Sequence, residues 1–373
     1  MRHTTLCILI SCALLSLSKA GIRLENIEYP FEEQVFEFDS QRLALEMVYM
    51  DLPAAGSSTR GTVLLLHGKN FSGSYFEETA RALSRAGFRV LMPDQIGFGK
   101  STKPTHYQYS FHQLAENTKS LLEAEGVRRV HVLGHSMGGM LATRFALMYP
   151  ETTASLTLLN PIGLEDWKAE GVPYPGIDAW YASELNKTGE KIRAYQLDSY
   201  YDGQWDDAYD PWVELLVAFI ESPDYPRMAW NQALTYDMIF TQPVVYEFPE
   251  LTMPTLLVIG QRDRTALGKG RVSPELRARL GNYPELGRAA HAAIPESELV
   301  EMEGIGHLPH IEDFEHFITP YLGFLKRRSK GAGAGRPGAL SSAFGWNGQK
   351  QALTTTLVSK TTLLPSRHGD AHE

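Results

Sequence analysis

Short apolar runs alternate with longer amphipathic segments along most of the chain. The apolar runs are continuous, and they lie at residues 61–66, 88–92, 129–133, 154–159 and 255–259. Runs of this kind predict strands that are buried on both faces of a sheet. Between them, apolar residues recur at helical spacing over 74–85, 111–124 and 137–148. The alternation predicts an α/β fold with a mostly parallel central sheet flanked by helices on both faces.

Both ends of this regular region carry further predicted elements. Residues 33–51 alternate between apolar and polar positions, which predicts an antiparallel hairpin ahead of the first buried strand. Near the other end, residues 298–302 predict a last strand, and residues 314–325 predict a closing helix.

The regular pattern is interrupted between residues 161 and 251. This segment holds five of the six tryptophans and nine of the seventeen tyrosines. Such bulky side chains fill the space between packed helices, and they also line pockets. We therefore expect 161–251 to form a helical cap inserted into an α/β core made of residues 21–160 and 252–328.

The two termini differ from this body in composition. Residues 1–20 have a short polar start, an apolar stretch and small residues at Ser18 and Ala20, as in a signal peptide. Residues 329–373 are rich in Gly, Ser and Thr and lack periodicity, so we expect a disordered tail. The chain is thus expected to be secreted or exported, either extracellular or, in a bacterium, periplasmic.

Charge and cysteine content exclude several classes of function. The chain has a net charge of −9, and its basic residues form no stripe along the body, which argues against a nucleic-acid partner. Both cysteines, Cys7 and Cys12, lie in the expected signal peptide, so the mature protein has no disulfide and no thiolate ligand. The apolar stretch of that segment is too short for a stable membrane anchor. No metal or cofactor motif is found, and we expect neither.

A candidate nucleophile lies at the junction of a predicted strand and a predicted helix. Residues 134–138 read Gly-His-Ser-Met-Gly and fit the G-x-S-x-G pattern. In this context the pattern is typical of a sharp turn that presents a serine at the carboxyl edge of the sheet. Gly134 and Gly138 are needed because a Cβ there would clash across the turn. We therefore expect Ser136 to be the nucleophile.

A serine hydroxyl needs a base, and the base needs an acid that orients it. His307 lies in a glycine-containing loop after the last predicted strand, from which it can return toward Ser136. Asp263 directly follows the preceding strand, so the order Ser136, Asp263, His307 is that of an α/β-hydrolase triad. Asp166, a few residues beyond an earlier strand, is the alternative acid.

Hydrolysis of an acyl bond also requires amide donors for the oxyanion. The residue after the nucleophile, Met137, supplies one donor from the start of its helix. The second is expected at Lys69, in the loop that follows the strand at 61–66.

Together these motifs resemble the α/β-hydrolase superfamily over about residues 28–326. The resemblance is to its capped branch, which includes epoxide hydrolases, haloperoxidase-like esterases, carbon–carbon bond hydrolases and proline iminopeptidases. The segments that carry it are His67-Gly68, residues 94–101, Gly134–Gly139, Asp263 and Gly306-His307.

Departures from these relatives narrow the expected reaction. Epoxide hydrolases use an aspartate nucleophile, whereas position 136 is serine, which favours acyl transfer. The loop at 67–71 reads His-Gly-Lys-Asn-Phe, without the glycine-rich run of proline iminopeptidases or carbon–carbon bond hydrolases.

The sequence therefore predicts a serine hydrolase that cleaves an ester or related acyl bond of a small, largely apolar substrate. A carbon–carbon bond hydrolase and an aminopeptidase of the same fold are the alternatives. A protein of another class, a non-catalytic ligand-binding homologue, would have lost a triad residue, whereas all three are present here.

The expected signal peptide gives a direct test. When the full chain is expressed with its export route intact, the mature protein is expected to begin at Gly21, because Ser18 and Ala20 supply the small residues before the cleavage point. Amino-terminal sequencing of the exported protein checks this. A mature chain that retains residues 1–20 would contradict the prediction.

Overall fold

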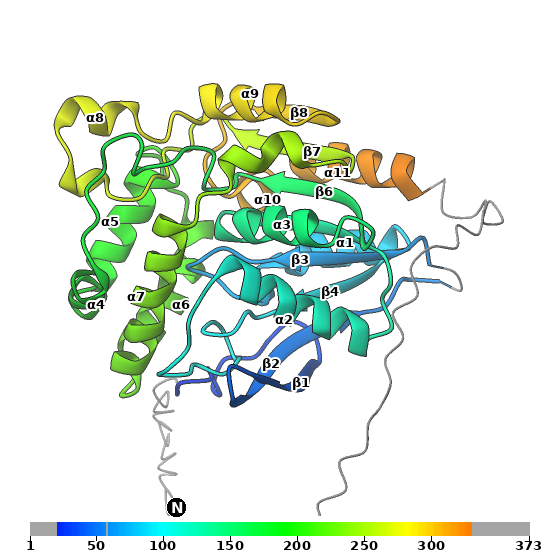
Figure 1. The fold of residues 1–373 in the computed structure, drawn as a ribbon, viewed down its shortest axis with the longest axis horizontal. Coiled ribbons are helices and arrows are strands. Elements are labelled where there is room, and N and C mark those ends of the chain that lie inside the picture. The colour runs from blue at the N-terminus through cyan, green and yellow to red at the C-terminus, as the bar shows by residue number, and fades with distance from the viewer. Residues whose placement is uncertain (1–20, 57–58, 330–373) are drawn as a thin grey trace, which may run out of the picture. The chain divides into compact units, whose positions relative to one another are not determined.

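The computed structural model describes residues 21–56 and 59–329 (Figure 1). The expected signal peptide at 1–20 and nearly all of the expected tail lie outside the described residues. Ser329, which we expected in the tail, is instead the last residue of α11 (Phe314–Ser329), so the helical periodicity continues past the predicted end at 325. The described residues form one compact unit.

An eight-stranded sheet forms the centre of this unit. Its order is β1-β2-β4-β3-β5-β6-β7-β8. β1 pairs antiparallel with β2, and β2 pairs antiparallel with β4, whereas the remaining neighbours are parallel. The mostly parallel sheet predicted from the apolar runs is therefore confirmed. The strands are β1 (Glu33–Ser40), β2 (Leu43–Leu52), β3 (Thr62–Leu66), β4 (Arg89–Pro93), β5 (Val130–His135), β6 (Thr153–Leu159), β7 (Thr255–Gly260) and β8 (Ser297–Met302).

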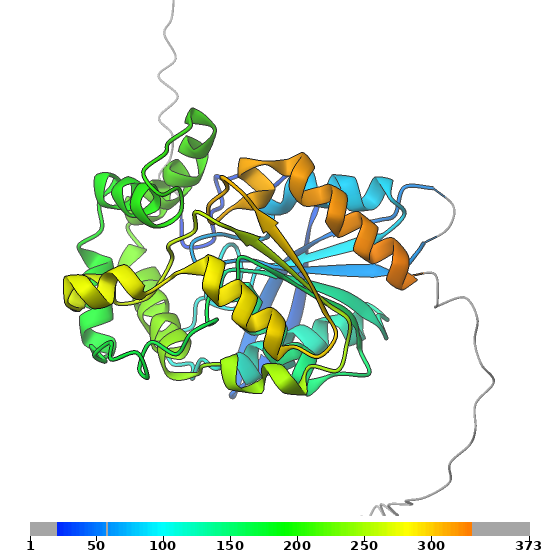
Figure 2. The same cartoon turned by 90° about the horizontal axis from the view of Figure 1, so that it is seen from above.

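Helices cover both faces of the sheet (Figure 2). One face carries α1 (Glu77–Arg85) and α11, and the opposite face carries α2 (Phe111–Ala124), α3 (Met137–Met148) and α9 (Tyr283–Ala293). The two faces have separate cores, because successive strand residues point in opposite directions. In β3, Val63 packs in the core under α1 and α11, whereas Leu64 packs in the core under α2 and α3.

The predicted helical cap is present between β6 and β7. It consists mainly of α4 (Ile177–Leu185), α5 (Gly189–Ser199), α6 (Asp210–Ile220) and α7 (Tyr225–Thr241). These helices gather at one end of the sheet, at the left of Figure 1. Since cap and core form one compact unit, the exact boundaries at 161 and 251 stay predictions.

Several local elements differ from the sequence-based expectation. The helix expected at 74–85 begins with a 3-10 turn, Gly73–Phe76, before α1. β5 continues to His135, because Gly134 and His135 still pair with β6. Three helices, α8 (Pro274–Arg279), α9 and α10 (Pro309–Glu312), were not predicted. Within the described ranges, no helix combines the length and apolar character needed to cross a bilayer.

Candidate active site

Ser136 lies on a strained turn between β5 and α3. Its backbone has φ 56° and ψ −121°, a region that side-chain-bearing residues rarely adopt and that costs about 1–3 kcal/mol. The turn is held by surrounding backbone: the Ser136 amide donates to the Leu159 carbonyl at 3.2 Å, and the Ser136 carbonyl accepts from Gly139 and Ile162. The side chain is placed where strand meets helix, as the motif predicts.

The glycines of the turn permit a very close approach of backbone segments. A Cβ on Gly134 would lie 2.0 Å from the Gly138 carbonyl oxygen, and a Cβ on Gly138 would lie 2.0 Å from the Leu66 carbonyl oxygen. Atoms cannot approach this closely, so β5, α3 and the end of β3 can meet only when both positions lack a side chain.

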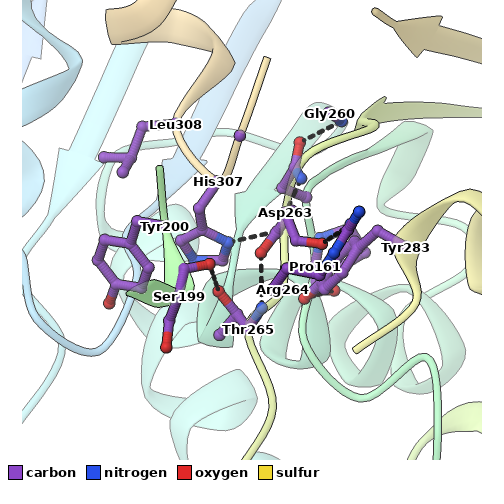
Figure 3. Close-up of polar contacts among 12 residues, drawn as sticks. Pro161, Ser199, Tyr200, Gly260, Asp263, Arg264, Thr265, Tyr283, His307 and Leu308 are labelled. Atoms are coloured by element: carbon purple, nitrogen blue, oxygen red, sulfur yellow. Dashed lines mark hydrogen bonds and ion pairs between the residues drawn. The ribbon is translucent and has the colours of Figure 1, made fainter. Parts of the chain in front are cut away.

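His307 and Asp263 form a buried hydrogen-bonded pair (Figure 3). The distance from His307 Nδ1 to Asp263 Oδ2 is 2.6 Å, and both side chains are fully buried. Asp263 also accepts from Asn160 Nδ2 at 2.8 Å and from the Thr265 amide at 2.8 Å. These donors fix the orientation of the carboxylate, which in turn fixes the imidazole.

The opposite nitrogen of this imidazole is free. Among the described residues, His307 Nε2 is buried and has no hydrogen-bond partner. The ring is held by Tyr200, whose carbonyl accepts from the His307 amide at 2.8 Å and whose own ring stacks on the imidazole at 4.5 Å between centroids. Because Nδ1 donates to Asp263, Nε2 carries the lone pair, which is the tautomer that a general base requires.

Asp166, the alternative acid, lies elsewhere. Its Oδ2 accepts from the Tyr246 hydroxyl at 3.1 Å, and its Oδ1 accepts from the Lys168 amide at 3.1 Å. It is partly exposed and makes no hydrogen bond to His307. The structure thus brings Asp263, and not Asp166, to the histidine.

The two expected oxyanion donors flank Ser136. Met137 is the first residue of α3, and Lys69 follows Gly68, on which a Cβ would lie 3.1 Å from the Ser136 Cβ. In the described part of the chain, neither the Met137 amide nor the Lys69 amide donates a hydrogen bond to protein. Both are therefore available to a bound oxygen.

A hydrogen-bond chain that the sequence did not reveal connects these loops. The Gly68 amide donates to the Tyr75 hydroxyl at 3.0 Å, and that hydroxyl donates to His135 Nδ1 at 2.7 Å. His135 Nε2 then donates to the His307 carbonyl at 2.8 Å. Burial holds the pKa of His135 well below its usual value, so the ring stays neutral and makes one donor and one acceptor bond.

Comparison with known proteins identifies the fold family. Residues 61–201 match the family model described as the alpha/beta hydrolase fold. The chain is 34% identical over 215 residues to a 2-hydroxy-6-oxo-6-phenylhexa-2,4-dienoate hydrolase of Burkholderia cepacia, covering 54% of this chain and 71% of that protein. The chain belongs to the α/β-hydrolase family.

Two further similarities support the assignment of this chain to the α/β-hydrolase family. Lipase 1 of Psychrobacter immobilis is 26% identical over 307 residues, covering 80% of this chain and 87% of that protein. A crystal structure of a probable hydrolytic enzyme from Pseudomonas aeruginosa is 50% identical, with a TM-score of 0.80, and the match covers 82% of this chain and 99% of that one.

A cavity of about 510 Å³ separates the loop after β3 from the cap of this α/β-hydrolase. Its wall includes Lys69, Asn70 and Phe71, and Lys69 directly follows Gly68, the glycine that approaches Ser136. Ser136 does not line the cavity, and only 6% of the residue is exposed. Aromatic cap residues do line it, as expected: Trp180, Tyr195, Phe219, Tyr225 and Tyr236. In the described ranges, no group of three or more metal-ligating side chains occurs.

The close approach at Gly138 gives a stability prediction. Gly138→Ala is expected to lower the free energy of unfolding by about 3 kcal/mol, because the new Cβ displaces the Leu66 carbonyl and with it the end of β3. Gly270→Ala, where a Cβ would meet nothing within 4 Å, is the control and is expected to change it by less than about 0.5 kcal/mol. Urea unfolding of both variants measures the difference, and equal stabilities would contradict the predicted contact.

Proposed function

We propose that this α/β-hydrolase cleaves an ester or a related acyl bond through an acyl-Ser136 intermediate. The observation that carries the proposal is the buried His307 imidazole, which is fixed by Asp263 on one side and has a free Nε2 on the other. A buried ring nitrogen without a partner is costly in a protein interior. The lack of a partner at His307 Nε2 is explained if this nitrogen is the base that takes the proton of Ser136.

The proposed reaction uses these groups in two steps. Ser136 Oγ attacks the carbonyl carbon while His307 Nε2 takes its proton, and the oxyanion accepts hydrogen bonds from the Lys69 and Met137 amides. Collapse of this intermediate breaks the bond to the leaving alcohol, which receives the proton from His307. Water then attacks the acyl-serine and loses a proton to His307 Nε2. Collapse of the second intermediate breaks the bond to Ser136 Oγ, which takes the proton back from His307, and the carboxylic acid is released.

The lipase similarity supports an ester as the bond that is cleaved. The similarity to the dienoate hydrolase keeps carbon–carbon bond cleavage as the alternative, and an aminopeptidase activity has no comparable support. A panel of methyl and p-nitrophenyl esters, aminoacyl arylamides and vinylogous diketones separates the three. Turnover of the diketones alone would favour the alternative.

Ser136 can be tested as the acylated residue. A fluorophosphonate probe reacts with an activated serine, so it is expected to label the wild type and not Ser136→Ala. Intact-mass measurement reports the adduct, and circular dichroism checks that the variant is folded. Equal labelling of the two proteins would refute the assignment.

The acid can be tested with a matched pair of variants. Asp263→Asn is expected to lower kcat by about 10³–10⁴, because an amide favours the wrong imidazole tautomer. Asp166→Asn removes a carboxylate from the same edge of the sheet and is expected to keep kcat within about twofold, since Asp166 makes no contact with His307. Steady-state ester hydrolysis gives both values. A larger loss in Asp166→Asn would make that residue the acid.

A further inference from the structure

The side chain of Lys69 enters the cavity below the cap without a carboxylate partner. Only 7% of the residue is exposed. Its ammonium donates to Gln232 Oε1 at 2.6 Å and lies 3.5 Å from the centroid of the Tyr236 ring, both on α7. In the described part of the chain, no Asp or Glu lies within ion-pair distance of it. A buried ammonium held only by an amide and an aromatic face is unusual, since buried charges are normally paired.

Glu184, the acidic residue of the cavity wall, is already engaged. Its carboxylate forms an ion pair with Lys187 at 2.8 Å and accepts from the Tyr225 hydroxyl at 3.4 Å. Lys187 lies 5.9 Å from the Tyr236 ring, so both ammonium groups lie near the same aromatic side chain. The cluster of Lys69, Glu184 and Lys187 therefore contains one more basic group than acidic group.

The other lysines of the wall satisfy their charges with backbone carbonyls. Lys103 donates to the carbonyls of Gly99 and Ser101, and Lys191 donates to the Asn186 carbonyl at 2.7 Å. Their ammonium groups are thus already solvated by protein. Among the lysines that line the cavity, Lys69 is the one that has neither a carboxylate nor a backbone carbonyl as its acceptor.

Burial changes the pKa of the Lys69 ammonium. Desolvation lowers the pKa of its ammonium to about 7, Glu184 acts in the opposite direction, and Lys187 lowers it further. An anion bound beside Lys69 would raise this pKa again and stabilise the charged form. The titratable groups that line the cavity with it are Lys103, Glu184, Lys187, Lys191, Tyr195, Tyr225 and Tyr236.

Another polar side chain that lines the cavity has no hydrogen-bond partner among the described residues. Gln196, on α5, is fully buried, and neither its amide nitrogen nor its amide oxygen forms a hydrogen bond with the described residues. Gln196 and Lys69 both line the cavity. An oxygen-rich ligand group there would accept from the Gln196 amide as well as from the Lys69 ammonium.

We propose that the substrate carries a carboxylate a few bonds from the scissile carbonyl, and that the Lys69 ammonium binds it. The inference rests on the proposed ester hydrolysis. In this arrangement one residue binds the substrate twice, with its backbone amide at the oxyanion and its side chain at the carboxylate. The length of a lysine side chain then sets the spacing between the two groups. The remaining apolar wall, including Trp180, Phe219 and Met228, receives the apolar part of the molecule.

Matched substrate pairs test the proposal. Methyl hydrogen adipate and methyl hexanoate share a scissile methyl ester and differ by a carboxylate on the acyl side. 5-Butanoyloxypentanoate and pentyl butanoate carry the same difference on the alcohol side. The wild type is expected to prefer the charged member of at least one pair in kcat/KM at pH 6.5 by about tenfold or more, as one charged hydrogen bond permits. The pair that shows the preference identifies the side of the substrate.

The variant Lys69→Met keeps the backbone amide and removes the ammonium. It is expected to lower the charged-to-neutral ratio of kcat/KM by about tenfold to a hundredfold. Lys168→Met removes an equal charge from a lysine outside the cavity, whose ammonium donates to the Thr241 carbonyl, and is expected to leave the ratio within about twofold. A ratio that is unchanged in Lys69→Met overturns the proposal.

The pH dependence of the ratio gives an independent readout in the unmodified protein. Lys69 is charged below its pKa, and a carboxylic acid is ionised throughout pH 6–9. The wild-type ratio is therefore expected to fall as pH rises through 7 and beyond, whereas the ratio in Lys69→Met stays flat. Any change in the base affects kcat/KM for both substrates equally, so it does not alter the ratio. If methyl hexanoate is hydrolysed and neither charged substrate is preferred, this inference alone is refuted. If the fluorophosphonate probe fails to label Ser136 in the wild type, the proposed function itself is refuted.

Discussion

The hydrogen-bond chain through Tyr75 and His135 joins three loops that the proposed reaction needs together. Its first donor is the amide beside Lys69, its middle member adjoins Ser136, and its last acceptor is the carbonyl of His307. Each link is buried and leaves no ring nitrogen of His135 unused. An unmade buried hydrogen bond costs about 1–3 kcal/mol. A shift of one loop would therefore break a hydrogen bond that also holds another loop, at a cost of that size. The spacing of the Lys69 loop, Ser136 and the His307 imidazole is thereby held by one neutral ring.

The strained backbone of Ser136 is held in place by close packing in the same region. Its left-handed backbone conformation persists because Gly134 and Gly138 allow β5, α3 and the end of β3 to pack at contact distance. A turn of this kind would relax in a looser protein. Here the buried strands on either side leave no room for relaxation, so packing in the core determines where the hydroxyl lies.

The sequence predicted the parts of the molecule that depend on local patterns. Continuous apolar runs located the parallel strands, and the placement of Ser136 and Asp263 followed from their positions at strand ends. Asn160, which orients Asp263, also follows a strand and could have been found in that way. Tyr75, Tyr200 and Gln196 could not, because their contacts join segments far apart in the chain. No periodicity records which cap helix faces which loop, and the charge imbalance around Lys69 exists only after folding.

The attachment of α5 to the core limits how the cap can move. At the carboxyl end of that helix, the Ser199 carbonyl accepts from the Arg264 amide, the Tyr200 carbonyl accepts from the His307 amide, and the Tyr201 carbonyl accepts from the Arg262 side chain. This part of the cap thus supports the loop that carries His307, and it also lines the cavity. A hinge that swung the whole cap outward would withdraw the support of the imidazole at the moment of substrate entry. Movement of the other cap helices around the end of α5 would leave these three hydrogen bonds, and with them the support of the imidazole, intact.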